Sequence, residues 1–146
     1  MRTARYLLVV LAAVLGCSDA KPYRTAAVSG RVTLDGKPLA GAVVSFTPVT
    51  KPGDALTGPG ARGETDADGK YALKTAFAER GATIGRNRVF ISTRRFERPP
   101  DQPDATARQT APERVPPKYF SDRSALYFDV PANGTSAANF DLTTGR

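Results

Sequence analysis

The stretch GETDADGKYAL, residues 63–73, places two carboxylates beside a glycine and ahead of a strand-like run. Asp66 and Asp68 stand at the first and third positions of an EF-hand-like pattern, but Lys70 stands at the fifth and a phenylalanine at the twelfth, where calcium requires oxygen ligands. A hairpin turn explains the stretch better, because Gly69 adopts positive φ easily and aspartates accept hydrogen bonds from turn amides. We therefore predict a structural turn and no metal site.

Short alternating runs lie on both sides of this turn. VSGRVTL (28–34) and AVVSFTPV (42–49) alternate apolar and polar residues, and Asp35-Gly36 between them is a strong turn dipeptide. In the second run, Val44 and Phe46 are expected to face the core. Further strand-like runs cover residues 63–65, 70–75, 85–93, 125–130 and 138–142. About seven short strands separated by turns predict an all-β protein built as a single β-sandwich.

The composition limits the chemistry. The chain has 146 residues, enough for one domain, and contains no histidine. Ser-His-Asp and Cys-His catalysis are therefore excluded within this chain, and no spacing of acids suggests another mechanism. We predict a protein that is not an enzyme and has no cofactor. The net charge of +7 favours anionic partners, although the chain has no dense basic block interleaved with aromatics that would predict nucleic-acid binding.

The first residues have the order of an export signal. Two arginines precede an apolar run of about ten residues, which is too short to span a bilayer. The run ends at Cys17, the only cysteine, and VLGC (14–17) resembles the bacterial lipobox. This resemblance implies cleavage before Cys17 and attachment of a diacylglycerol to its thiol. We expect a signal peptide (1–16), a polar tether (17–27) and a chain held by membrane lipid in the cell envelope, with a secreted form as the alternative.

Residues 94–117 contain six prolines and charges of both signs, so we predict a flexible loop. At its start, Arg94, Arg95 and Arg98 surround Phe96 in the strongest basic-aromatic cluster of the chain. Guanidinium groups bind carboxylates and phosphates in bidentate fashion. The three arginines are therefore the candidate site for an acidic glycan or a lipid headgroup, and a solvated loop is the alternative.

VSGRVTLDGKPLAGAVVSFTPV (28–49) followed by TDADGKYAL (65–73) resembles the carboxypeptidase regulatory-like domain. The resemblance covers most of residues 28–142, apart from the predicted loop. It implies a seven-stranded, transthyretin-like (prealbumin-like, Ig-like) sandwich without catalytic activity, in a small envelope lipoprotein that acts structurally or binds an envelope protein or glycan. The turn residues expected to define this fold are Asp35, Gly36, Asp66, Asp68 and Gly69.

Overall fold

The computed structural model describes residues 21–50, 58–101, 104–121 and 124–145. Over these ranges the protein is all-β, as predicted, and its single helical element is a 3-10 turn, η1 (Pro117–Tyr119). The predicted signal peptide, Cys17 and the first part of the tether lie outside the described residues. No helix in the described part of the chain has both the length and the apolar character needed to cross a bilayer.

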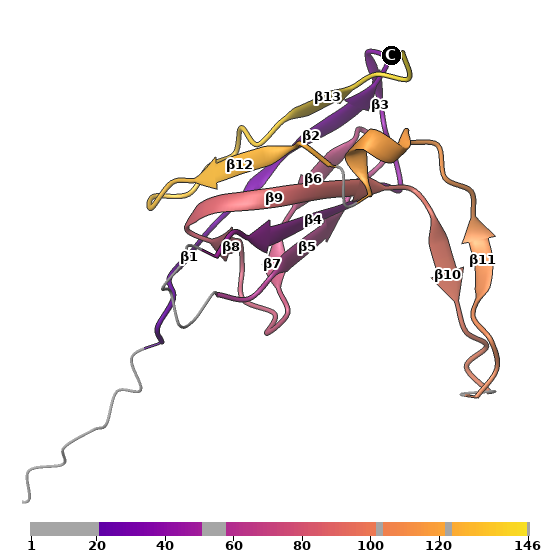
Figure 1. Cartoon of the computed structure of the whole chain (residues 1–146), viewed down its shortest axis with the longest axis horizontal. Helices are drawn as coiled ribbons and strands as arrows, with labels where there is room; N and C mark the ends of the chain where they lie inside the picture. The colour runs from indigo at the N-terminus through magenta and orange to yellow at the C-terminus, as the bar shows by residue number, and fades with distance from the viewer. Residues whose placement is uncertain (1–20, 51–57, 102–103, 122–123, 146) are drawn as a thin grey trace, which may run out of the picture.

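Two main sheets make up the body of the protein (Figure 1). The larger sheet is antiparallel throughout, and its strands lie in the spatial order β12 (Tyr127–Val130), β9 (Gly85–Ser92), β4 (Val43–Pro48), β5 (Ala61–Glu64) and β7 (Lys74–Thr75). The smaller sheet is centred on β2 (Ser29–Leu34), which pairs in parallel with β13 (Phe140–Leu142) and antiparallel with β3 (Lys37–Pro38) and β6 (Lys70–Ala72). A short pair, β1 (Thr25–Ala26) with β8 (Ala82–Thr83), joins residues near the N-terminal end of the described chain to the start of β9.

The run 70–75, predicted as one strand, is divided between the two sheets, because β6 pairs with β2 and β7 pairs with β5. Between them, Leu73 is buried and its N–H donates to the carbonyl of Val28 at 2.9 Å. The chain thus passes from the smaller sheet to the larger one at Leu73 and connects their edges.

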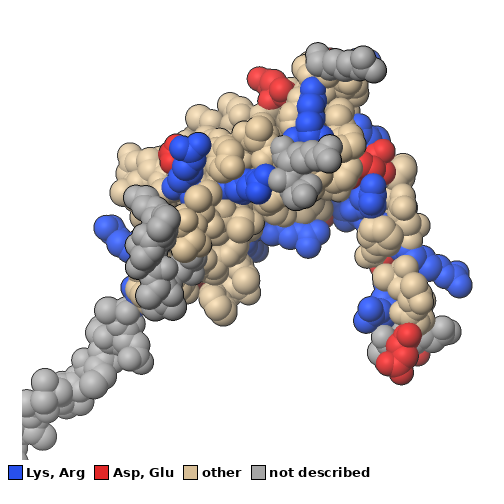
Figure 2. All heavy atoms as spheres, viewed as in Figure 1, with Lys and Arg blue, Asp and Glu red and all other residues tan. Residues whose placement is uncertain are grey.

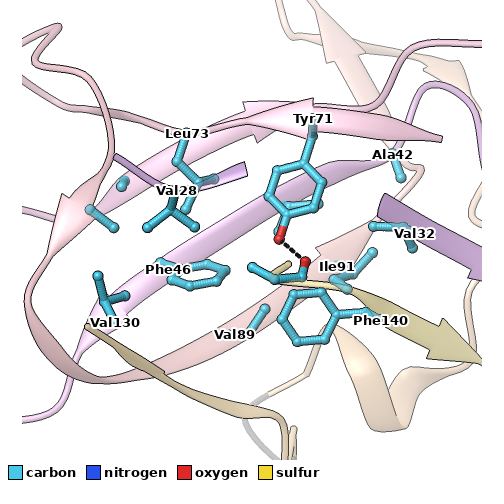
Figure 3. Packing of buried hydrophobic residues seen from close by; sticks show 14 of the residues in the cluster. Val28, Val32, Ala42, Phe46, Tyr71, Leu73, Val89, Ile91, Val130 and Phe140 are labelled. Atoms are coloured by element: carbon cyan, nitrogen blue, oxygen red, sulfur yellow. Dashed lines mark hydrogen bonds between the residues drawn. The ribbon is translucent and has the colours of Figure 1, made fainter. Parts of the chain in front are cut away.

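The inward side chains of both sheets form one hydrophobic core (Figure 3). Phe46 of β4 is 1% exposed, and its ring lies 5.8 Å from that of Phe128 and 6.2 Å from that of Phe140. Val44 is also buried, so the alternation predicted for β4 is confirmed. The Tyr71 hydroxyl donates a 2.6 Å hydrogen bond to the carbonyl of Ala138, and burial raises the pKa of this phenol. The one polar group of the Tyr71 ring is thereby satisfied inside the core.

The turn between β2 and β3 has the geometry that its sequence favours. Asp35 and Gly36 have φ values of 50° and 78°, the positive φ at both central residues that a type I′ hairpin turn requires. The Asp35 carboxylate accepts hydrogen bonds from the Thr144 hydroxyl and N–H at 2.7 and 2.9 Å. The side-chain bond, followed by the backbone bond, lowers the pKa of Asp35. This turn therefore also fixes the C-terminal end of the described chain.

The prediction of a loop over residues 94–117 needs correction. The segment contains two paired strands, β10 (Arg95–Glu97) and β11 (Arg108–Ala111), which project from the body as a hairpin arm (Figure 1). The prolines do not prevent pairing, because they lie between the two strands or after β11 and so remove no donor from the ladder. Both faces of the arm are largely exposed, which explains why its strands lack apolar alternation.

Candidate functional site

The stretch around Asp66 forms the turn between β5 and β6. The N–H groups of Asp68 and Lys70 both donate to Oδ1 of Asp66 at 2.9 Å, and Gly69 has a φ of 75°. The Asp68 carboxylate is exposed and pairs with Lys70 at 3.7 Å. In the described part of the chain, no three histidine, cysteine or acidic side chains are grouped to hold a metal ion. The predicted turn is confirmed, but it is not a hairpin turn, because β5 pairs with β4 and β7 whereas β6 pairs with β2 of the smaller sheet.

Thr65, which the sequence did not single out, is a buried residue that precedes the Asp66 turn and hydrogen-bonds to the segment before β4. Its hydroxyl donates to the Leu39 carbonyl at 2.6 Å and accepts from the Ala42 N–H at 2.8 Å. Its backbone N–H donates to the Ala42 carbonyl, and its carbonyl accepts from the N–H of Gly41. One threonine thus holds the start of the 65–69 turn against the segment between β3 and β4.

The three candidate arginines do not form a common cluster. Arg95 forms an ion pair with Glu64 of β5 and donates a further hydrogen bond to the Gly41 carbonyl at 3.3 Å. The Arg94 guanidinium lies over the ring of Phe120, 5.6 Å from its centroid. Arg98 is exposed beyond the end of β10. Arg95 therefore attaches the arm to the body, and each of the three arginines has different surroundings.

An open groove of about 650 Å³ lies between the arm and the larger sheet. Strand β10 forms one wall, with the exposed ring of Phe96, and β4, β5 and β7 form the other. Its lining contains four basic and two acidic side chains: Arg62, Lys74, Arg94, Arg95, Glu64 and Glu97. The Arg95–Glu64 ion pair joins the two walls. The groove therefore carries a net positive charge, and the Phe96 ring lies on the side formed by the arm.

Arg62 and Lys74 are directly opposite each other in the β5–β7 ladder. Both side chains are exposed, and no acidic side chain lies within ion-pair distance of either in the described structure. Glu64 follows Arg62 by two residues on the same strand, but its carboxylate is bound to Arg95. Like charges directly opposite each other destabilise an antiparallel pair, so this arrangement is unfavourable unless an anion lies there.

The row of residues that contains Arg62 continues across the outer face of the larger sheet. Arg62 pairs with Ser45 of β4, which pairs with Phe90 of β9. Ser45 therefore lies between the basic edge of the sheet and Phe90 in this row. Further along β9, Arg86 lies over the Tyr127 ring at 4.6 Å. Figure 2 shows basic side chains spread over the body and along the arm, with acidic side chains at the tip of the arm.

Glu113 lies two residues after the end of β11 and attaches the base of the arm to the body. Its carboxylate accepts hydrogen bonds from the Ser92 hydroxyl, from the hydroxyl and N–H of Thr93, and from the N–H of Val115, the last three at 3.0 Å. Partial burial acts to raise the pKa of Glu113, but these hydrogen bonds outweigh it and lower the pKa below its ordinary value. The wall of the groove formed by β10 therefore depends on an ionised carboxylate.

We expect Glu113→Gln to lower the free energy of unfolding by about 1 kcal/mol at neutral pH, allowing for solvent exposure. Because the folded state lowers the Glu113 pKa, its contribution is complete above the ordinary pKa of about 4.5 and disappears as the pH falls through the lowered value. Urea unfolding of both proteins between pH 3 and 7, roughly spanning this range, measures the difference. Glu97→Gln serves as the control, and a difference that persisted unchanged at the lowest pH would contradict this assignment.

Comparison with protein-family models, with curated proteins and with solved structures finds no match for the chain. The function of the groove therefore has to follow from its own geometry. Lys74 lies in the predicted run 70–75, but Arg62 lies just before the predicted run 63–65, and the pairing of the two residues depends on the register between β5 and β7.

Proposed function

We propose that the protein is a non-enzymatic binding protein of the bacterial cell envelope, anchored by lipid on Cys17. The observation that carries the binding function is the groove beside β10, where Arg62 and Lys74 have no acidic partner among the described residues. A pair of unneutralised charges on a shaped surface favours an anionic partner. The lack of histidine in the chain and the use of Glu64 in an ion pair support binding rather than catalysis.

The resemblance of residues 28–49 and 65–73 supports a finer architecture. We propose that the two sheets form a transthyretin-like sandwich of the carboxypeptidase regulatory-like type. The turns at Asp35-Gly36 and Asp66–Gly69 support this proposal, because these residues carry the resemblance. The hydrogen bonds of Thr65 to the segment before β4 also lie within the sequence that carries it. In this arrangement the two turns would stabilise the body, and the arm would carry the binding function.

The lipid anchor is proposed from the sequence VLGC (14–17) and the basic and apolar residues before it. Cleavage before Cys17 followed by acylation would leave the chain tethered through residues 17–27. Several acyl chains hold a protein in a membrane far more durably than one. A secreted cationic module, with the same groove and no anchor, is the second candidate, and it is favoured by the positive net charge of +7.

The mass of the intact protein from bacterial membranes tests the anchor directly. We expect a chain that begins at Cys17 and carries additional acyl mass, located in the membrane fraction. Cys17→Ser should remove the acyl mass and release the protein from that fraction. An unacylated chain in the soluble fraction would contradict the anchor and favour the secreted module.

A further inference from the structure

We propose that the groove between β10 and the β5–β7 edge binds a linear acidic polysaccharide, whose carboxylates contact Arg62 and Lys74 while a sugar ring lies against Phe96. The inference rests on the proposed binding function and adds the class of ligand and the residues that hold it. The proposed anion site therefore lies on β5 and β7, across the groove from the arginines of 94–98 that the sequence indicated.

The electrostatics of the β5–β7 edge favour an anion. Arg62 and Lys74 are opposite each other in the ladder, exposed, and without an acidic partner among the described residues. The nearest acid along β5, Glu64, is bound to Arg95 and does not neutralise them. A bound carboxylate would turn a repulsive pair into two charge-assisted hydrogen-bonding partners, and a guanidinium matches a carboxylate in bidentate geometry.

The shape of the groove suits an extended chain of rings. Phe96 is 58% exposed and lines the groove, so a large apolar ring faces solvent beside the basic pair. A pyranose ring has an apolar face that packs on aromatic rings, and its carboxylate projects from the edge of the ring. The groove is open, which suits a polymer rather than an enclosed small molecule.

One acidic side chain of the groove distinguishes a polysaccharide from other polyanions. Glu97 lines the groove together with the basic residues, and it forms no ion pair among the described residues. It would repel the closely spaced phosphates of a nucleic acid or the dense surface of an anionic membrane. A uronate polymer instead carries one charge per sugar and several hydroxyl groups. Those hydroxyls can donate hydrogen bonds to Glu97, so a mixed lining fits a sparsely charged, hydroxyl-rich chain.

The arm is fixed in a position suited to this role. Arg95 bridges to Glu64 and to the carbonyl of Gly41, and Glu113 fastens the segment where the chain returns to the body. These contacts hold Phe96 at the groove without occupying Arg62 or Lys74. A preformed wall lowers the ordering cost of binding.

The test measures the affinity of the full-length protein for oligogalacturonate by titration calorimetry, at low and at physiological salt. We expect Arg62→Ser combined with Lys74→Ser to weaken binding about tenfold or more at low salt, and to reduce its salt dependence. Phe96→Ser should weaken binding severalfold at both salt concentrations, because stacking is not screened. Lys37→Ser combined with Lys70→Ser removes the same charge from exposed positions on the smaller sheet and should change affinity less than about twofold.

Three results would overturn the proposal. Equal weakening by the two double variants would show a diffuse charge effect. The groove would belong to another polyanion if a single-stranded oligonucleotide, or phosphatidylglycerol–phosphatidylcholine vesicles, bound more tightly per unit charge than oligogalacturonate. Absence of oligogalacturonate binding would remove the ligand class. None of these results bears on acylation at Cys17, which the mass measurement decides separately. Circular dichroism of each variant should match that of the unaltered protein, and a near-native spectrum is required before its affinity is compared.

Discussion

Phe46→Ala is expected to lower the free energy of unfolding by about 3–5 kcal/mol, the usual cost of truncating a buried phenylalanine. Phe46 lies in the centre of β4, is 1% exposed, and contacts the rings of Phe128 and Phe140 from β12 and β13. It therefore joins the larger sheet to the smaller one. Truncation would remove its own buried area and leave a cavity between two aromatic rings.

Urea denaturation followed by circular dichroism measures this effect. Phe77→Ala is the matched control, because Phe77 is 69% exposed and its truncation should change stability by less than about 0.5 kcal/mol. A loss below about 1 kcal/mol for Phe46→Ala would contradict the assignment of this ring to the shared core.

Gly69→Ala should cost about 2–5 kcal/mol, through two separate physical effects. The residue has a φ of 75°, and left-handed backbone costs an alanine about 1–2 kcal/mol. A Cβ atom at this position would also lie 2.4 Å from the carbonyl oxygen of Val32 and 3.2 Å from the backbone nitrogen of Leu39. Since both are backbone atoms of packed segments, the turn would have to move away from β2.

Gly36→Ala separates the two effects. Gly36 has a similar φ of 78°, but a Cβ atom added there would meet no other atom within 4 Å, so its substitution carries only the backbone cost. The difference between the two variants in urea denaturation therefore measures the close approach of the 66–69 turn to β2. Equal losses of stability would show that this turn does not pack against β2 as described.

Local sequence signals predicted the elements that depend on neighbouring residues. The alternation around Val44 and Phe46 predicted β4, because one face of a half-buried strand must be apolar. Asp35-Gly36 and Asp66–Gly69 predicted turns, because their side chains and conformational freedom act within a few residues. These features need no knowledge of which strand lies beside which.

The groove could not be predicted in the same way. The opposition of Arg62 and Lys74 follows from the register of two strands, and the Arg95–Glu64 ion pair joins residues that are distant in the sequence. The prolines and mixed charges of the arm predict a loop. Its strands carry no periodic apolar signal against that prediction, because both of their faces are largely solvated. The density of basic residues in the sequence therefore indicates Arg94, Arg95 and Arg98. The basic pair without an acidic partner among the described residues, Arg62 and Lys74, lies on the other side of the groove.

The most direct test of the groove is a map of amide chemical-shift changes when oligogalacturonate is added to the isotope-labelled full-length protein. We expect the largest changes in β5, β7 and β10, at Arg62, Lys74 and Phe96, with little change in β3 and β6 of the smaller sheet. Changes centred on the smaller sheet, or spread evenly over the basic surface, would contradict the account of a binding groove beside the hairpin arm.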